Sequence, residues 1–338
     1  MTSQVSQPGM NGRSGPRILA VRLGAMGDII HALPAVATLK HSFPRCHLCW
    51  VVEPRWAPLL DGNPFVDEVV LFNRGSLRGL LETRRRLRAG RFDVAVDFQG
   101  LLKSALVASA ARPEKIIGYH PAEAREPLAA LFYSTKVRPR SLHIVDRHLE
   151  LAAAAGATNL LKSFPLPPGA PEGELPEGPF VLASPLAGWV SKQWPAESYA
   201  ALGRMLRERL GIPLVLNAPP GDAASLAGIP DTIPHTSGLP GLIHATRRAA
   251  AVVGVDSGPL HLAAALGKPG VAILGPTDPA RNGPYGGSIK TLRSPSARVS
   301  YKRRTAIDPS MREITPEMVM EALQEPLAAL RTSAGGVS

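Results

Sequence analysis

Apolar positions in the first half of the chain form short runs that alternate with longer amphipathic stretches. Runs rich in Val, Ile and Leu are typical of strands buried on both faces of a sheet, and the stretches between them predict helices. The runs are RILAVRL (17–23), LCWVVE (48–53), VDEVVLF (66–72), DVAVDF (93–98) and KIIGY (115–119), and the helices are expected at 28–42, after Phe72 and through LLKSALVASA (101–110). This alternation predicts a parallel sheet covered by helices.

The second half repeats the alternation after a segment rich in proline and glycine. Residues 162–179, KSFPLPPGAPEGELPEGP, leave no room for a helix or an internal strand and predict an interdomain linker. Beyond it, strands are expected at FVLASPL (180–186), PLVLNA (213–218), AAVVGVD (250–256) and GVAILG (270–275), and helices near 196–210, 241–248, 259–266 and 316–330. We therefore expect two α/β domains, 17–161 and 180–331, with a cleft between them and ligands beyond the carboxyl ends of the strands.

The two ends of the chain predict tails. Residues 1–16 are polar and lack the apolar centre of a secretory signal, and residues 332–338 continue past the last expected helix. No apolar run reaches the roughly 18 to 20 residues that cross a bilayer. We expect a cytoplasmic protein that is not integral to the membrane.

The formal net charge of +11 is concentrated in one arginine-rich segment. Between Leu71 and Phe92 there is one acid, Glu82, and there are seven arginines: Arg74, Arg78, Arg84, Arg85, Arg86, Arg88 and Arg91. Nucleic acid, an anionic membrane surface or a phosphorylated glycolipid would each match this charge. The alternative is a solvated basic helix whose leucines, Leu77, Leu80, Leu81 and Leu87, face the core.

The chain has two cysteines, Cys46 and Cys49, at the start of an expected strand. Side chains three positions apart on a strand point to opposite faces, which disfavours both a disulfide and a chelate. A structural zinc site needs about four ligands, and the sequence offers no second pair. We expect no metal site there.

The first strand ends in L-G-A-M-G-D, which places Asp28 at the entrance to the next helix. A carboxylate there can act as the N-cap of the helix, accepting backbone N–H bonds. It can also face the cleft and accept a proton from a substrate hydroxyl. The full G-x-G-x-x-G spacing is absent, which argues against the alternative of a nicotinamide-dependent oxidoreductase.

Two loops of the second half suit a diphosphate. In V-D-S-G-P-L-H, the backbone N–H groups of Ser257 and Gly258 and the dipole of the helix that starts there favour an anion, and His261 could donate to a phosphate oxygen. Asp256 would repel phosphate, so we expect its partners to be sugar hydroxyls or the amides of its own loop. In the loop S-P-L-A-G-W-V-S-K-Q-W-P, Gly188 permits close backbone approach and Lys192 could neutralise a departing diphosphate.

Several segments in this order resemble the lipopolysaccharide heptosyltransferases of glycosyltransferase family 9 from Arg17 to about Leu330. They are R-L-G-A-M-G-D-I-I-H-A-L-P-A, D-F-Q-G-L-L-K-S-A, A-R-E-P-L-A-A-L-F-Y, S-K-Q-W-P, V-D-S-G-P-L-H-L-A-A-A-L and G-P-T-D-P. The segments D-F-Q-G and A-R-E-P-L favour the heptosyltransferase I type over heptosyltransferase II.

The resemblance implies a GT-B fold, in which two Rossmann-like domains with parallel sheets face a central cleft. It implies an inverting enzyme without a catalytic metal or other cofactor, with the acceptor bound by the first domain and ADP-heptose by the second. Carried over by position, it implies that Asp28 is the general base and that Lys192 faces the diphosphate. Asp97 is the alternative base, because it also lies at the carboxyl end of an expected strand. Nucleotide-sugar binding is implied for Gly188, Asp222, Asp256, Ser257, Gly258 and His261.

The resemblance also implies an acceptor, the 3-deoxy-manno-octulosonic acid of the lipopolysaccharide inner core, which is linked to phosphorylated lipid A. Arginine matches carboxylates and phosphates through its bidentate geometry. The positions expected to hold the acceptor are Gly27, Arg74, Arg78, Lys103, Arg125 and Arg147. We expect peripheral association with the cytoplasmic face of the inner membrane and no nucleic-acid partner, because the arginine segment has only Phe72 and Phe92 as aromatic residues.

The chain departs from the family pattern at Leu186, Ala187 and Gly188, where related enzymes can have hydroxyl residues. Phosphate contacts in this loop would therefore have to come from backbone N–H groups.

Overall fold

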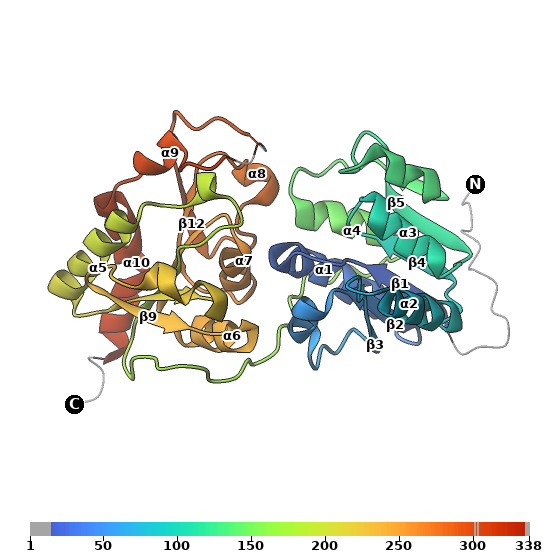
Figure 1. Ribbon diagram of the computed structural model, residues 1–338, viewed down its shortest axis with the longest axis horizontal. Coiled ribbons are helices and arrows are strands. Elements are labelled where there is room, and N and C mark those ends of the chain that lie inside the picture. Colours follow the sequence, from blue (N-terminus) through green and yellow to red (C-terminus); the bar gives the residue numbers. More distant parts are fainter. Residues whose placement is uncertain (1–14, 301, 303, 335–338) are drawn as a thin grey trace. The chain divides into compact units, whose positions relative to one another are not determined.

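The computed structural model of the protein describes residues 15–300, 302 and 304–334. The chain divides into two compact units, residues 1–166 and 167–338, each built on one six-stranded sheet with helices packed against it (Figure 1). Except for residues 15, 16 and 332–334, the two expected tails lie outside the described residues. Within the described part of the chain, no helix has the length and apolar character needed to span a membrane.

The first unit follows the alternation of strands and helices that the apolar runs predict. Its elements are β1 (Arg17–Val21), α1 (Met26–Ser42), β2 (His47–Val52), η1 (Pro54–Leu60), β3 (Glu68–Leu71), α2 (Leu77–Ala89), β4 (Val94–Asp97), α3 (Leu102–Ala110), β5 (Lys115–Tyr119), η2 (Pro127–Phe132), β6 (Thr135–Val137) and α4 (Ile144–Ala154).

The second unit repeats this plan. Its elements are β7 (Val181–Ser184), η3 (Val190–Lys192), α5 (Ala196–Leu210), β8 (Leu214–Ala218), η4 (Pro220–Leu226), β9 (Thr232–Thr236), α6 (Leu239–Arg248), β10 (Ala251–Val255), α7 (Gly258–Ala265), β11 (Gly270–Leu274), α8 (Pro279–Asn282), β12 (Ile289–Arg293), α9 (Pro309–Arg312) and α10 (Pro316–Ala334).

The strand order is the same in both units. It runs β3-β2-β1-β4-β5-β6 in the first sheet and β12-β11-β10-β7-β8-β9 in the second, and neighbouring strands pair in parallel, as in the register Val21↔Asp97 between β1 and β4. This is the doubly wound Rossmann order, whose switch point lies where the chain leaves the central pair of strands in opposite directions. The switch points are β1/β4 and β7/β10, so the loops after these four strands are where ligands are expected.

The expected helices are present, and three of them begin before the positions we predicted. α1 begins at Met26, α6 at Leu239 and α7 at Gly258. The sequence analysis does not anticipate the strands β6, β9 and β12 or the helix α4. β6 and β9 are the outer strands of their sheets and β12 is an edge strand with exposed Lys290 and Thr291, so none of them has the continuous apolar run of an interior strand.

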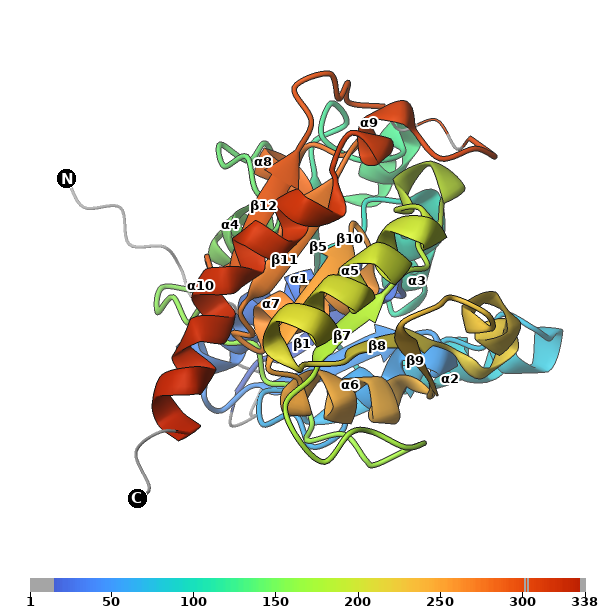
Figure 2. The same cartoon turned by 90° about the vertical axis from the view of Figure 1, so that its left-hand side faces the viewer.

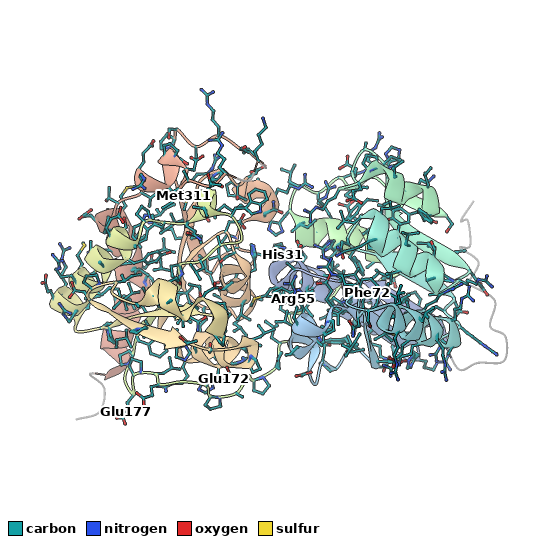
Figure 3. All side chains as sticks on the ribbon, in the orientation of Figure 1. His31, Arg55, Phe72, Glu172, Glu177 and Met311 are labelled. Atoms are coloured by element: carbon teal, nitrogen blue, oxygen red, sulfur yellow. The ribbon has the colours of Figure 1, made fainter. Side chains whose placement is uncertain are left out.

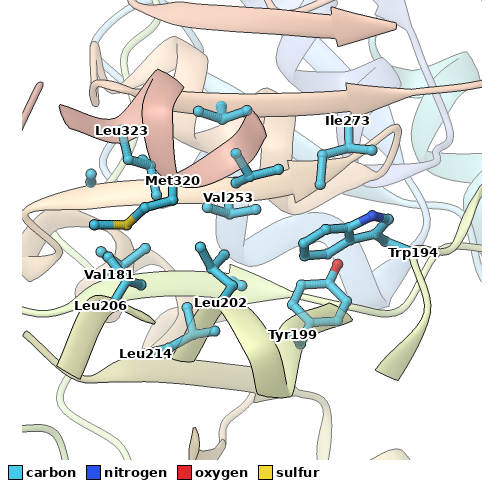
Figure 4. Close-up of a cluster of buried hydrophobic side chains, with 14 of the residues drawn as sticks. Val181, Trp194, Tyr199, Leu202, Leu206, Leu214, Val253, Ile273, Met320 and Leu323 are labelled. Carbon is cyan, nitrogen blue, oxygen red and sulfur yellow. The ribbon is translucent and has the colours of Figure 1, made fainter. Parts of the chain in front are cut away.

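The core of the second unit lies between its sheet and the helices α5 and α10 (Figures 2 and 4). Trp194 is 2% exposed, meets the ring of Tyr199 edge to face at 4.9 Å between centroids, and donates its indole N–H to the Ile314 carbonyl at 2.8 Å. Aromatic side chains with a satisfied polar atom make strong anchors. Trp194 therefore fixes the segment that carries Lys192, two residues earlier.

The leucines of α2 do not face the core as one reading of the sequence expects. Leu77 is 80% exposed, Leu81 63% and Leu80 38%, whereas Leu87 is buried. The buried side of α2 consists of Gly79, Thr83 and Leu87, which repeat every four residues along one helical face. The exposed side of α2 is consequently both apolar and basic.

The residues expected to form a linker are bound along both units. In the first unit, the Asn63 side chain donates to the Pro165 carbonyl at 3.2 Å, and the Lys162 ammonium lies 2.9 Å from the Asp146 carboxylate. In the second unit, the Glu172 carboxylate accepts from the N–H groups of Gly238 at 2.6 Å and Gly241 at 3.1 Å. Glu172 thus caps the N-terminus of α6, where backbone donors lack helical partners.

Replacing Glu172 with Ala should destabilise the second unit by about 1–2 kcal/mol, because two donors at the N-terminus of α6 lose their acceptor. Urea denaturation and hydrogen exchange at the α6 amides would measure the loss. Glu177, whose side chain is exposed (Figure 3), provides a matched control. Glu177→Ala should leave the stability to urea and the hydrogen exchange of the α6 amides unchanged. Equal effects of the two substitutions would contradict the capping role.

Candidate functional site

Asp28 lies in the first turn of α1, directly after β1, at the switch point of the first sheet. It is the third residue of the helix and not its N-cap, which is Ala25. Its Oδ2 accepts the Ala25 N–H at 3.1 Å, and its Oδ1 lies 2.6 Å from a guanidinium nitrogen of Arg22. The Asp28 side chain is 34% exposed, so it can still meet a ligand. Asp28 can therefore accept the Ala25 N–H at the start of the helix and contact a substrate at the same time.

Arg22 controls the charge of Asp28. Its side chain is 3% exposed and also donates to the Phe98 carbonyl at 2.7 Å, which holds the guanidinium in place. Burial alone would raise the pKa of the Asp28 carboxyl. The positive charge of Arg22, the Ala25 N–H and the charge of Arg125 outweigh burial and hold that pKa below its usual value. Asp28 is therefore a carboxylate at neutral pH.

Asp97, the alternative base, is enclosed by donors. It is completely buried and accepts hydrogen bonds from Tyr133 Oη at 2.7 Å, Ser104 Oγ at 2.8 Å, and the backbone N–H groups of Gln99 at 2.8 Å and Gly100 at 3.3 Å. Such a carboxylate shapes the turn between β4 and α3 and has no exposed oxygen to offer a substrate. The expectation that Asp97 could serve as the base is wrong for this geometry.

Two of the expected acceptor residues meet at one carboxylate. Lys103 Nζ lies 3.1 Å and Arg74 Nε 3.7 Å from Glu53 Oε1. Arg78 lies on the exposed side of α2, and Gly27 is buried in the first turn of α1. These four residues are carried by elements that follow β1, β3 and β4, at the same edge of the sheet.

The two remaining acceptor candidates differ in exposure. Arg125 is exposed, and its charge reaches Asp28. Arg147 is buried, and its guanidinium is paired with Glu123 at 2.8 Å and lies over the ring of Tyr119. The guanidinium of Arg147 thus has an anionic partner within the fold, and its contact with the acceptor stays a prediction.

In the second unit, Lys192 and Asp256 lie after the switch-point strands β7 and β10 and bind each other. Lys192 Nζ is 2.5 Å from Asp256 Oδ2 and also lies 4.3 Å from the centroid of the Trp189 ring. Thr277 Oγ1 donates to the same carboxylate oxygen at 2.6 Å, and His261 Nε2 lies 3.4 Å from Oδ1. Asp256 is thus held by three side chains that the sequence did not predict as its partners, and its expected contact with sugar hydroxyls stays a prediction.

The charges of this cluster stabilise one another. Burial would raise the pKa of the Asp256 carboxyl, but the hydrogen bond and charge of His261 and the ammonium of Lys192 hold it far below its usual value. Lys192 and Asp256 are 18% and 11% exposed, so the pair is largely removed from water. Lys192 is therefore held beside Asp256, whose negative charge balances that of the lysine.

The N-terminus of α7 offers donors beside the cluster. Ser257 is the N-cap of this eight-residue helix, and its side chain does not cap it. Its Oγ is buried and, within the described part of the chain, has no hydrogen-bond partner. A buried hydroxyl without a partner is costly, and a ligand oxygen at this helix end would satisfy it.

The other two donor-side candidates lie in exposed segments. Gly188 has open space where a side chain would begin, so its backbone can be approached. Asp222 lies in η4, after β8, outside the bonded cluster of Lys192, Asp256, Thr277 and His261. The structure thus brings Lys192, Asp256 and His261 together and leaves Asp222 apart from them.

Three residues that contact the predicted site residues were not predicted from the sequence: Arg22, Glu53 and Thr277. Each lies at or directly beyond the carboxyl end of a strand, so the rule that identified Asp28 and Asp256 also points to them. Cys46 and Cys49 are free and buried, and burial raises the pKa of the Cys46 thiol to about 11. No group of three or more metal-binding side chains occurs among the described residues.

Comparison with known proteins agrees with this architecture. The family model described as glycosyltransferase family 9 (heptosyltransferase) matches residues 80–309. Lipopolysaccharide heptosyltransferase 1 of Pseudomonas aeruginosa is 32% identical over 308 residues, which cover 82% of this chain and 84% of that protein. Lipopolysaccharide heptosyltransferase 2 of Escherichia coli is 27% identical over 346 residues, covering 91% and 97%.

A solved structure extends the likeness to the fold. The E. coli heptosyltransferase WaaC with ADP has a TM-score of 0.73 and 28% identity, covering 92% of this chain and 99% of that chain. The GT-B fold is confirmed, and the nicotinamide-dependent alternative finds no support among these relatives. From its sequence match and from the two doubly wound sheets, the chain belongs to glycosyltransferase family 9, the heptosyltransferases.

Proposed function

We propose that this chain transfers L-glycero-D-manno-heptose from ADP-heptose to the 3-deoxy-manno-octulosonic acid of the lipopolysaccharide inner core, with inversion. The observation that carries the chemistry is Asp28, an ionised and partly exposed carboxylate at the switch point of the first sheet. The identity of 32% to a heptosyltransferase 1 against 27% to a heptosyltransferase 2 supports the first type. Transfer to a heptosylated core, as by heptosyltransferase II, is the alternative.

In the proposed reaction the first unit supplies the base. Asp28 uses Oδ1 for Arg22 and one lone pair of Oδ2 for the Ala25 N–H, which leaves a lone pair on Oδ2 for the acceptor hydroxyl. Oδ2 takes the hydroxyl proton as the acceptor oxygen bonds to the anomeric carbon of heptose, and the bond from that carbon to the diphosphate breaks. One displacement inverts the anomeric configuration.

In the same reaction the second unit receives the leaving group. ADP departs with increased negative charge, which Lys192, the N-terminus of α7 and the Ser257 hydroxyl would stabilise. His261 and Thr277 hold Asp256, and Asp256 keeps Lys192 in place until the diphosphate shares the charge of the ammonium.

We further propose that the first unit binds the cytoplasmic leaflet through one surface, the α2–α3–η2 surface. α3 packs against both α2 and η2, and all three elements expose leucines, while the arginines lie on α2 and just before it. The surface consists of Leu77, Leu80, Leu81, Leu106, Leu128 and Leu131 with Arg74, Arg78, Arg84, Arg85 and Arg86.

Apolar and basic side chains together match an anionic lipid surface. Each leucine moved from water into the acyl region contributes about 1.5–3 kcal/mol, and each arginine near anionic headgroups about 1 kcal/mol. The exposed leucines explain why a bilayer is a better partner than nucleic acid, which would not cover Leu77 (80% exposed) or Leu131 (77% exposed). An acceptor linked to lipid A would be reached from that position.

Asp28→Asn should lower kcat by about 10²–10⁴-fold, the usual contribution of a general base. The amide oxygen can still accept the Ala25 N–H, so α1 should remain capped. Transfer from ADP-heptose to heptose-free core, followed by mass spectrometry, measures turnover, and calorimetry with ADP should show nearly unchanged binding. Retention of most of the turnover by Asp28→Asn would show that another group is the base.

Arg22→Gln should move the acid limb of the pH profile of kcat/KM to higher pH. The base acts when deprotonated, so activity is lost as pH falls through the pKa of Asp28. Arg22 keeps that pKa below 3.8, and without its charge the burial of the carboxyl raises the pKa. As the pH is lowered, the variant should therefore lose kcat/KM before the wild type does. Arg45→Gln, at an exposed arginine, is the control. If the pH profiles of Arg22→Gln and the wild type coincide, the base is not a carboxyl whose pKa Arg22 lowers.

Leu77→Gln with Leu81→Gln should weaken binding to vesicles that contain anionic lipid by at least about tenfold, because two apolar insertions are lost. Co-sedimentation measures binding, and kcat with a short, lipid-free acceptor should stay unchanged. Leu142→Gln, at a leucine 74% exposed outside the α2–α3–η2 surface, is the matched control. If the double variant and this control bind vesicles equally well, the proposed surface is not the docking surface.

A further inference from the structure

Glu53 is a largely buried carboxylate surrounded by three cations. Its Oε1 lies 3.1 Å from Lys103 Nζ and 3.7 Å from Arg74 Nε, and its Oε2 lies 3.4 Å from a guanidinium nitrogen of Arg55. These cations come from the segments after β4, β3 and β2, so residues far apart in the sequence converge on a single side chain.

The burial of these four side chains is uneven. Glu53 is 9% exposed, whereas Arg55 is 65%, Arg74 63% and Lys103 39% exposed. The carboxylate thus forms the floor of the cluster, and the donors that it does not use face outward. Three positive charges against one negative leave a surplus of two, which favours an anion above this floor.

The floor is attached to the loop that precedes Asp28. The Glu53 N–H donates to the Leu23 carbonyl at 3.0 Å. A Cβ at Gly24 would lie 2.7 Å from Trp56 Nε1 and 3.8 Å from Glu53 Oε2, so only glycine permits this close packing. Arg55, labelled in Figure 3, lies over the Trp56 ring at 4.7 Å. An anion bound by the cations would consequently be held next to the glycine loop of the base.

We propose that Glu53 is a positioning residue that gathers Arg55, Arg74 and Lys103 into one binding site for an anionic group of the acceptor. Without the carboxylate, the three cations would repel one another and separate, and the site would lose its shape. The inference rests on the proposed function, and it adds Arg55 and Glu53 to the groups that recognise the acceptor. The bound group is a phosphate or a carboxylate, since both accept from two or more cationic donors.

The test uses Glu53→Gln in the full chain at saturating ADP-heptose, with the concentration of heptose-free lipopolysaccharide core varied. Gln keeps the size of the side chain and removes its charge. We expect the KM for the acceptor to rise about tenfold or more, the scale of a lost charged contact, while kcat changes less than about threefold. The KM for ADP-heptose should not change. Glu68→Gln, at a half-exposed carboxylate paired with His47, is the control and should match the wild type.

Two further measurements separate positioning from simple stability. Arg55→Gln alters an exposed side chain and should fold, and it should raise the acceptor KM in the same way. Glu53→Asp keeps the charge on a shorter side chain and should recover part of the loss.

An acceptor treated with phosphatase identifies the bound group. If the difference in acceptor KM between wild type and Glu53→Gln disappears, the bound group is a phosphate. If the difference persists, the bound group is a carboxylate.

The inference and the proposed function fail in different ways. If the wild type adds no heptose, the proposed function is contradicted. The affinity for the heptose-free core can then still be measured without donor for the wild type, Glu53→Gln and Arg55→Gln. An unchanged acceptor KM, or unchanged direct binding, in both variants overturns the role of Glu53. Equal losses with Glu68→Gln would overturn it as well, because the effect would not be specific to the cluster.

Discussion

Parallel pairing of the strands is the constraint on which both candidate sites depend. Because parallel strands all end at the same edge of a sheet, the residues that follow them are carried to one place however far apart they are in the sequence. In the first unit this edge brings together Asp28, Glu53, Arg74 and Lys103, and in the second Lys192, Asp256 and Thr277. The loops diverge at β1/β4 and β7/β10, which leaves room for a ligand there.

Buried ion pairs give these edges their chemical character. A buried charge is tolerated only with a partner and hydrogen bonds. Both units meet this condition, since Arg22 pairs with Asp28 and Lys192 pairs with Asp256. Arg22 fixes Asp28 as an anion and leaves one oxygen partly free, whereas Asp256 is shared by three donors. The same kind of pair thus holds an anion in one unit and a cation in the other, which are the two charges that the proposed reaction uses.

The sequence predicts much of the fold because interior parallel strands have continuous apolar runs, which the runs at 17–23 and 250–256 display. The outer strands, such as β6 and β9, lie against solvent on one edge and lack this pattern. Motif spacing identifies Asp28, Asp256 and His261, since glycine turns and helix starts mark them. It cannot show that Arg22 is buried against Asp28, that Arg147 is paired with Glu123, or that Asp97 is enclosed by four donors. These contacts join residues up to 36 positions apart or depend on burial.

The pair of Lys192 and Asp256 explains how charge balance could favour the transition state over the bound donor. In the proposed reaction, Lys192 offers the diphosphate of the intact donor only part of its charge, because Asp256 is its partner. As the anomeric bond breaks, the leaving oxygen gains charge and competes better for the ammonium, while Thr277 and His261 continue to stabilise Asp256. Only interactions that strengthen during the reaction raise kcat. A lysine held by a carboxylate therefore suits departure of a diphosphate better than an exposed lysine, whose charge would be spent on binding the ground state.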